Sequence, residues 1–384
     1  MTTINQLVAN RCPNGVPFMT VGSLFKTLST PRGIKRSDYD LGTKIPIIDQ
    51  GQSLIAGYSD DEARLIPRGD YIVFGDHTRA VKWIDFPFAV GADGTKVLEA
   101  DRVLVPKFGY YALTNLIIPN RGYNRHWTIL RDMVLPVPPL EVQQEIVRIL
   151  DKFTELEAEL EAELEARQKQ YAHYRQSVFS SIDAPSTPLR MLGEWRGGGT
   201  PAKSKPEYWT NGTVPWISPK DMGLTAIYQT QDQITEEATL NSSARLLPKD
   251  SVALVVRSSI LDRILPIAHV PIEAALNQDM RAVIAKEGVL PRYIFHALSN
   301  FSEDMLRRCR RTGGSVAALV TKQLMMFEIP LPDLVEQRRI VAILDSFDAL
   351  VNGISSGLPA EIAARRKQYE YYRDKLLSFE ELPA

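Results

Sequence analysis

Clusters of arginine, lysine and small polar residues are the side chains of this sequence with the clearest chemistry. The segment FGDHTRAVKW (74–83) follows a run of strand-forming residues and offers five such side chains: Asp76, His77, Thr78, Arg79 and Lys82. Arginine pairs with guanine edges in the major groove, and lysine and threonine hold phosphates, so this segment is a candidate DNA-contact loop. The alternative is a solvated turn that only closes a hairpin.

Similar side chains recur elsewhere in the chain. VVRSSILDR (255–263) occupies the matching place in the second half, and RRCRRTGGS (307–315) is the densest basic run, which favours a phosphate clamp over a solvated helix end. A glutamine amide can pair with adenine. The candidate contacts outside the first loop are Arg32, Lys35, Arg36, Gln50, Lys203, Lys205, Ser218, Lys220, Arg257, Ser258, Ser259, Arg307, Arg310 and Arg311.

Several other chemistries are disfavoured. His77 has no second ligand at metal spacing, and the two cysteines, Cys12 and Cys309, form no CxxC pair, so no metal site is expected. DFPF (85–88) lacks the paired prolines of an adenine methyltransferase motif, and no GxxxxGK[ST] loop is present. Core packing is favoured over base stacking for Tyr208 and Trp209, because duplex readers seldom need stacking platforms.

These candidates lie on two copies of one unit. LPVPPLEVQQEIVRILDKF (135–153) aligns with IPLPDLVEQRRIVAILDSF (329–347), and QKQYAHYR (168–175) with RKQYEYYR (366–373). Weaker landmarks recur upstream in the same order, among them RLIPRGDYIVF (64–74) and RLLPKDSVALV (245–255). The pattern indicates two diverged β-rich domains, each followed by a better-matched helical segment.

The helical segments predict a coiled coil. Residues 140–180 contain no Gly or Pro and place apolar residues at heptad spacing, which predicts a helix about 60 Å long. We expect the two segments to pair antiparallel, with the basic residues that flank the octapeptide tyrosines facing outward for partner docking or DNA approach: Arg167, Lys169, Arg175, Arg365, Lys367 and Arg373. The seam residues are Ile146, Leu150, Phe153, Leu160, Leu164, Tyr171, Tyr174, Ile340, Leu344, Phe347, Tyr369 and Tyr372.

Composition bounds the class of protein. The chain has 384 residues, 44% of them hydrophobic and 24% charged, with a formal net charge of −1, so any basic surface must be local. Nothing at the N-terminus suggests a signal peptide, and no stretch reaches the length of about 18 apolar residues that a membrane span needs. A cytoplasmic protein without a membrane partner is expected.

Four segments together resemble the specificity subunit of type I restriction-modification systems. They are IVFGDHTRAVKWIDFPFAVGADG (72–94), GGGTPAKSKPEYWTNGTVPWISPKDM (197–222), IPLPDLVEQRRIVAILDSFDAL (329–350) and AARRKQYEYYRDKLLSF (363–379). The resemblance covers nearly the whole chain. It implies an α+β fold with two mixed α/β target recognition domains, joined by two long helices packed as an antiparallel coiled coil in a pseudo-twofold tandem repeat.

The resemblance also implies that different segments of the chain have different roles. The expected segments are recognition domain 1 (1–136), spacer helix 1 (137–183), recognition domain 2 (184–330) and spacer helix 2 (331–384). Each recognition domain is expected to bind one half of a bipartite, asymmetric site in double-stranded DNA. One departure is NGISSGLP (352–359), which is expected to bend the second spacer helix.

The same resemblance implies that this chain is not catalytic. It is expected to recruit two modification (M) subunits, which methylate adenine with S-adenosylmethionine, and restriction (R) subunits, which use ATP and magnesium, so no cofactor is expected in this chain. Two alternatives stay open: a non-catalytic scaffold that bridges protein partners, and a DNA methyltransferase fused to its specificity domains, which the missing motifs disfavour.

Overall fold

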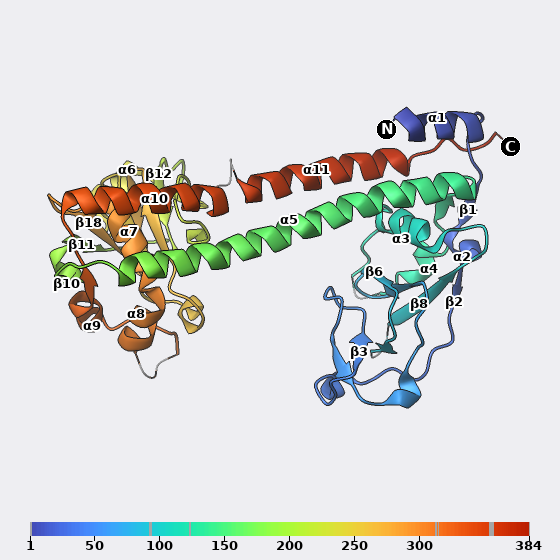
Figure 1. Cartoon of the computed structure of the whole chain (residues 1–384), viewed down its shortest axis with the longest axis horizontal. Coiled ribbons are helices and arrows are strands. Elements are labelled where there is room, and N and C mark those ends of the chain that lie inside the picture. Colours follow the sequence, from blue (N-terminus) through green and yellow to red (C-terminus); the bar gives the residue numbers. More distant parts are fainter. Residues whose placement is uncertain are drawn as a thin grey trace. The chain divides into compact units, whose positions relative to one another are not determined.

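The chain divides into two compact units in a computed structural model (Figure 1). The model describes residues 2–91, 94–122, 124–311, 313, 315–352 and 357–383. Unit 1 comprises Met1–Glu159 and Ala363–Ala384, and unit 2 comprises Leu160–Ile362. The expected recognition domains, 1–136 and 184–330, each fall inside one unit, whereas the long helical segments are shared between the two.

Unit 1 contains two small sheets. One has the strand order β2-β8-β5-β6 and the other β4-β3-β7, and β1 pairs with β9 in a separate ribbon. All five residues of β5 are buried, as its central place in the sheet requires. The strands are β1 (Phe18–Thr20), β2 (Phe25–Thr27), β3 (Ile45–Ile48), β4 (Gly57–Ser59), β5 (Tyr71–Gly75), β6 (Val81–Ile84), β7 (Ala89–Val90), β8 (Thr95–Ala100) and β9 (Val134–Pro136).

Unit 2 repeats this topology. Its sheets have the orders β11-β18-β15-β16 and β13-β12-β17-β14, and β10 pairs with β19. The strands are β10 (Ser186–Pro188), β11 (Gly193–Gly197), β12 (Val214–Ile217), β13 (Asp232–Ile234), β14 (Leu246–Leu247), β15 (Ser251–Val255), β16 (Ile267–Val270), β17 (Ala274–Leu276), β18 (Met280–Ala285) and β19 (Glu328–Pro330). In each unit one parallel pair, β3 with β7 or β12 with β17, stands among antiparallel strands. The predicted tandem repeat of an α+β domain is therefore confirmed.

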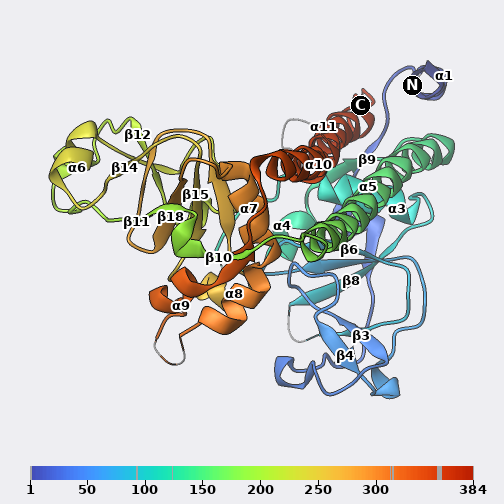
Figure 2. The ribbon, with the colours of Figure 1, turned by 60° about the vertical axis from the view of Figure 1, so that its left-hand side comes forward.

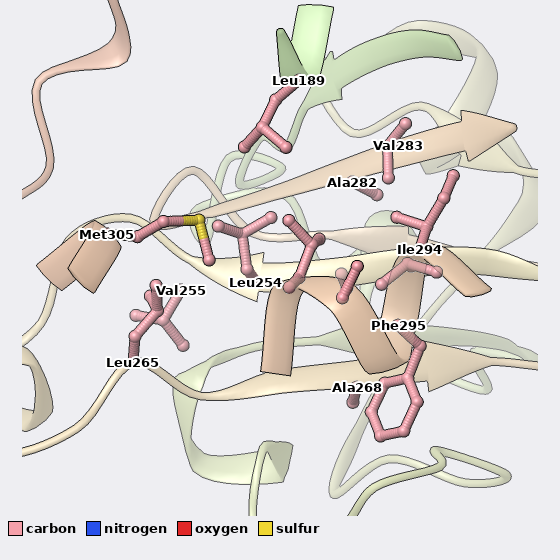
Figure 3. Packing of buried hydrophobic residues seen from close by; sticks show 14 of the residues in the cluster. Leu189, Leu254, Val255, Leu265, Ala268, Ala282, Val283, Ile294, Phe295 and Met305 are labelled. Carbon is pink, nitrogen blue, oxygen red and sulfur yellow. The ribbon is translucent and has the colours of Figure 1, made fainter. Parts of the chain in front are cut away.

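Each unit also contains short helices. Unit 1 has α1 (Thr2–Arg11), α2 (Val21–Leu24), α3 (Pro106–Thr114) and α4 (Trp127–Leu130); unit 2 has α6 (Glu236–Asn241), α7 (Pro291–Asn300), α8 (Ser302–Cys309) and α9 (Thr321–Met326). In unit 2, α7 lies against strands β15, β16 and β18 (Figure 2). Its Ile294 and Phe295 pack with Leu254 and Ala268 of the strands and Met305 of α8 in one buried cluster (Figure 3).

The first long helix, α5, spans Leu140–Ser180, as the sequence predicts. Its middle is rich in Glu, Leu and Ala, which favour helix, and ion pairs one turn apart join Glu163 to Arg167 and Glu165 to Lys169. The second copy forms two helices, α10 (Leu334–Asn352) and α11 (Leu358–Leu376). The helix is interrupted at the predicted place, although residues 353–356 of that segment lie outside the described part of the chain.

The long helices pack against each other inside each unit. In unit 1, Phe153 of α5 meets Tyr372 and Tyr369 of α11, with ring centroids 5.6 and 6.3 Å apart. Further along α5, Glu157 binds Arg366, which lies earlier in α11, so the pair is antiparallel. In unit 2, Phe347 of α10 packs against Tyr171 and Tyr174 of α5 at 6.2 and 5.2 Å.

The predicted seam needs one correction. Ile146, Leu150, Ile340 and Leu344 are completely buried, but they belong to clusters that contain the cores of the recognition domains. Tyr174 is 37% exposed. The reason is that two apolar surfaces, the other helix and the adjoining domain, share the apolar face of each helix. The heptad face therefore docks a domain as well as a helix.

Candidate nucleic-acid interface

The loop predicted to contact DNA in unit 1 is the turn between β5 and β6. Two of its side chains point into the domain, which corrects two predicted contacts. The Asp76 carboxylate is 2% exposed and accepts a hydrogen bond from the Trp127 backbone N–H at 2.7 Å. Lys82 is 6% exposed and donates to the Asp49 carbonyl at 2.7 Å. Burial lowers the pKa of Lys82, against the opposing effect of Asp49.

The other residues of this turn meet the loop that follows β3. The Thr78 hydroxyl donates to the Gln50 carbonyl, and the Gln50 side-chain oxygen accepts from the His77 backbone N–H at 3.2 Å. Gly94, at φ +89°, faces both, and a Cβ there would lie 2.7 Å from the His77 ring and 2.8 Å from the Gln50 oxygen. Glycine is therefore required for this close approach. The structure thus brings Gln50, His77 and Thr78 together.

Arg79 adopts a conformation that is uncommon for arginine. Its φ is +64°, in the left-handed region, and one guanidinium nitrogen donates to the Ile118 carbonyl at 2.9 Å. Such outliers cluster at functional turns. The guanidinium carries five N–H donors, so this single hydrogen bond orients the group and leaves donors for a further acceptor.

The basic segment 32–36 approaches the same part of unit 1. The Ile34 N–H binds the Val90 carbonyl at 2.9 Å, and the Gly91 N–H binds the Ile48 carbonyl at 2.8 Å. Arg32, Lys35 and Arg36 are exposed, and no ion pair within the described residues engages their side chains. Three predicted segments of unit 1 therefore converge at Gly91 and Gly94, the described ends of the connection between β7 and β8.

Unit 2 shows the same convergence with different residues. Arg257, which follows β15, binds the Asp279 carboxylate at 2.5 Å, and Asp279 lies in the turn between β17 and β18. On the other side of this turn, the Thr200 hydroxyl donates to the Gln278 side chain. Ser258 caps η6 (Ser259–Asp262) through Ile260 N–H at 3.4 Å, and Ser259 is exposed.

The basic run at the end of α8 lies beside the loop after β15. Backbone bridges join Arg257 to Ala318 and Arg310 to Leu319, and the Arg310 guanidinium binds Asp262. Arg307 pairs with Asp304 at 2.5 Å, whereas Arg311 is exposed and has no ion pair within the described residues. The structure therefore brings the predicted contact loop and the predicted phosphate clamp together. Thr312 and Gly314 of this run lie outside the described residues.

The remaining candidates of unit 2 differ in accessibility. Ser218 is 5% exposed, and its N–H and hydroxyl both bind Asp221 at 2.9 Å in a capping box, so its predicted contact with DNA is corrected. Lys203 is exposed, and Lys220 is exposed but paired with Asp232 at 2.6 Å, which raises the pKa of Lys220. A hydrogen bond to Tyr208 raises the pKa of the exposed Lys205.

The aromatic side chains of this region belong to the core, as predicted. Tyr208 is 5% exposed, and the half-buried Trp209 packs edge-on against Trp216, with centroids 5.2 Å apart. Among the described residues, no cluster of three or more His, Cys, Asp or Glu side chains could hold a metal ion. No helix in the described part of the chain is both long and apolar enough to span a membrane.

Sequence reasoning missed the polar residues that dock each domain on its long helix. Asp151 of α5 accepts hydrogen bonds from Tyr111 at 2.6 Å and Lys107 at 3.0 Å, both on α3. Burial, and then the hydrogen bond to Asp151, raises the pKa of Tyr111 far above its ordinary value. Two buried glutamines, Gln143 and Gln337, belong to the same contacts. The sequence does contain a signal for them: both copies carry a glutamine at the same position of an otherwise apolar helix face.

Unit 2 docks at the equivalent positions with other groups. Asp345 of α10 contacts Arg292 at 2.5 Å and His296 at 2.7 Å, both on α7, and Arg292 also reaches Asp348 at 3.2 Å. Burial opposes ionisation of Asp345, yet the hydrogen bonds from His296 and Arg292 keep its pKa below the ordinary value. Burial lowers the pKa of His296, which is completely buried.

Comparisons with known proteins agree with this architecture. The family model described as "Type I restriction modification DNA specificity domain" matches residues 13–166 and 188–364. The chain is 45% identical, over 90% of its length and 90% of the relative, to the type I restriction enzyme EcoR124I/EcoR124II specificity subunit of Escherichia coli.

Solved structures share the fold at lower identity. The S subunit of a type I restriction-modification system from M. genitalium superposes with a TM-score of 0.57 and 16% identity, covering 94% of this chain and 96% of that one. A chain from a study titled as the complex assembly and conformational transition of the type I R-M system gives a TM-score of 0.59 and 18% identity, covering 95% and 98%. These likenesses support the α+β fold.

Proposed function

Because this chain belongs to the family of type I restriction-modification specificity subunits, we propose that it selects the DNA site for such a complex. Each recognition domain binds one half of a bipartite, asymmetric sequence in double-stranded DNA. The chain acts as the non-catalytic recognition subunit, and its partners perform the chemistry.

One observation carries this proposal. The two units share strand order, and in both of them polar and basic segments converge on the same turn, β7 to β8 or β17 to β18. The side chains that converge there differ, with Gln50, His77 and Thr78 in unit 1 and Thr200, Gln278 and Arg257 in unit 2. A shared scaffold with different contact chemistry supports recognition of two different half-sites.

Electrostatics supports contact with the DNA backbone. The chain as a whole has a formal net charge of −1, so phosphate attraction must come from local groups. Exposed Arg32, Lys35 and Arg36 in unit 1 and Lys203 and Arg311 in unit 2 have no ion pair within the described residues. These groups are the proposed phosphate contacts, and the polar side chains that converge at Gly94 and at the turn between β17 and β18 are the proposed base contacts.

The proposed partners follow from the family. Two modification subunits would methylate adenine with S-adenosylmethionine, and restriction subunits would require ATP and magnesium, so the cofactors belong to the partners. Within this proposal the outer faces of the long helices bind the modification subunits. The complex acts in the cytoplasm, where DNA and these cofactors are present.

Sequencing of modified bases in DNA from cells that produce this chain with its modification subunit tests the proposal. We expect methylated adenines in two short half-sites separated by a fixed gap. Exchange of residues 1–134 with those of a relative should change one half-site, and exchange of residues 184–328 should change only the other. Simultaneous change of both half-sites by either exchange contradicts separate recognition. Absence of a split motif in the wild type favours a scaffold function.

A further inference from the structure

Both copies hold the recognition domain on the long helix through one buried glutamine. In unit 1, Gln143 of α5 is 0% exposed. Its Oε1 accepts from the Val105 N–H at 2.7 Å, and its Nε2 donates to the carbonyls of Val103 at 2.9 Å and Pro138 at 2.7 Å. The amide therefore joins α5 to the loop that leads into α3 and to the proline turn before α5.

Gln337 of α10 makes the same contacts in unit 2, where it is 1% exposed. Its Oε1 accepts from the Leu290 N–H at 2.9 Å, and its Nε2 donates to the carbonyls of Gly288 at 3.1 Å and Pro332 at 2.8 Å. Leu290 and Gly288 precede α7, and Pro332 precedes α10. We call each of these three-bond arrangements a glutamine clasp.

The chemistry of the clasp is specific to an amide. It supplies one acceptor and two donors in a fixed plane, which matches one backbone N–H and two backbone carbonyls. Glutamate lacks the donors, and an apolar side chain takes the buried partner away from all three backbone groups. Apolar contacts tolerate a small slide or tilt of the helix, whereas these directional bonds do not. The clasp therefore fixes orientation more sharply than the surrounding Ile and Leu contacts.

The two copies preserve the clasp while its surroundings differ. Gln143 is followed by Gln144 and Glu145, but Gln337 is followed by Arg338 and Arg339. In both copies an aspartate, Asp151 or Asp345, lies eight positions after the glutamine, about two helical turns away. Each helix thus holds its domain at two polar points, of which the glutamine contacts only backbone atoms. This makes the clasp independent of the side chains in either recognition domain.

We propose that Gln143 and Gln337 are positioning residues that fix the angle and register of each recognition domain on its helix, and so set how strictly the protein discriminates the gap between its two half-sites. The inference rests on the proposed function. One added base pair moves a half-site by about 3.4 Å and rotates it by about 36°. Rejection of such a site requires a stiff attachment of both domains.

The test uses the full chain in complex with its modification subunit. Methylation rates are measured on duplexes whose half-sites are separated by the natural gap or by a gap one base pair shorter or longer. We expect Gln337→Met to reduce the preference for the natural gap by about tenfold, the effect of one lost set of buried hydrogen bonds. The base preference within each half-site should stay unchanged.

A matched control separates positioning from stability. Val252→Ala removes apolar atoms from the buried β15 strand and lowers the unfolding temperature without touching the clasp. It should keep the wild-type preference for the natural gap. If Gln337→Met lowers the unfolding temperature yet keeps that preference, the clasp is only structural and the inference is wrong.

The remaining outcomes concern a variant that does not fold and a wild-type protein that does not discriminate the gap. If Gln337→Met does not fold, Gln143→Met in the other unit decides, since the same loss of gap preference is expected from it. Failure of the wild-type protein to discriminate the gap at all contradicts the proposed function, because a fixed gap is part of that proposal. Loss of discrimination confined to the two glutamine variants supports the clasp.

Discussion

The two units dock their recognition domains on equivalent helical positions with different chemistry. In unit 1, Asp151 accepts hydrogen bonds from Lys107 and Tyr111. In unit 2, Asp345 accepts hydrogen bonds from Arg292 and His296. The aspartates belong to the better-matched helical segments, and their partners belong to the diverged domains. The positions of the contacts are therefore kept, and the groups that fill them are exchangeable as long as a donor faces each carboxylate.

The difference changes how each contact responds to conditions. Tyr111 stays protonated through the physiological range, because burial and Asp151 raise its pKa. Burial lowers the pKa of His296, and the groups that face it are Asp345, Arg292 and Asp348 in addition to the Tyr171 hydroxyl, 3.4 Å from its Nδ1. Burial raises the pKa of Tyr171 to about 12, so Tyr171 stays neutral. Of the two docking contacts, only the second contains a histidine, and burial lowers the pKa of that histidine.

Removal of the shared carboxylate should have the largest effect. Asp345→Ala removes the carboxylate acceptor of the buried His296 and leaves Arg292 with Asp348 alone, and we expect it to lower the free energy of unfolding by about 2 kcal/mol. This loss is smaller than for a fully buried ion pair, because the Asp345 side chain is 38% exposed and partly screened by water. Chemical denaturation measures the change. Asp151→Ala is the matched variant and should cost less, because Asp151 accepts two hydrogen bonds from α3 whereas Asp345 accepts three from α7. An equal or larger loss there would contradict this order.

The loss of folding stability at acidic pH should be the next largest effect. Burial lowers the pKa of His296 in the folded state below its ordinary value of 6.5, so the unfolded chain binds more protons below that pH. Stability from the neutral histidine is present above about pH 6.5 and falls as the pH drops, by at most about 1.4 kcal/mol per pH unit. The contribution of Asp345, whose folded pKa is also lowered, is lost only in more acidic solution.

Substitution by the residue of the other copy sharpens this prediction. His296→Tyr should flatten the stability curve between pH 7.5 and 5.5, measured by thermal unfolding in a series of buffers. His269 is unchanged in the variant and keeps its own contribution to the slope, because burial lowers its pKa as well. Parallel curves for the variant and the wild type would exclude His296 as the titrating group.

A buried hydroxyl should account for the smallest difference. Tyr293 of α7 is completely buried and donates to the Pro330 carbonyl at 2.5 Å, whereas unit 1 has Phe108 at the equivalent place in α3. Tyr293→Phe should lower the free energy of unfolding by about 1 kcal/mol, the net value of one hydrogen bond. A change within the error of denaturant titration would mean that the Pro330 carbonyl finds another donor. The half-sites that the complex methylates and its preference for the natural gap should not change.

Much of the architecture could be predicted because it depends on local patterns. The bounds of α5 follow from a stretch without Gly or Pro, and the interruption of the second helix follows from the Gly and Pro of 352–359. The repeat, the mixed domains and the family follow from self-similarity and motif order. Side-chain roles were harder, because Asp76, Lys82 and Ser218 have the right chemistry for DNA but are buried.

The sequence by itself determined two copies of an α+β recognition domain, the long helices and the family to which the chain belongs. These depend on hydrophobic period, chain punctuation and internal repetition, which act over short distances along the chain. Only the tertiary structure decided which polar residues face inward, and that Gln143 and Gln337 clasp loops far away in the sequence. The physical reason is that the sequence records only the type of a polar residue, which is the same whether its side chain binds water, DNA or a buried backbone group.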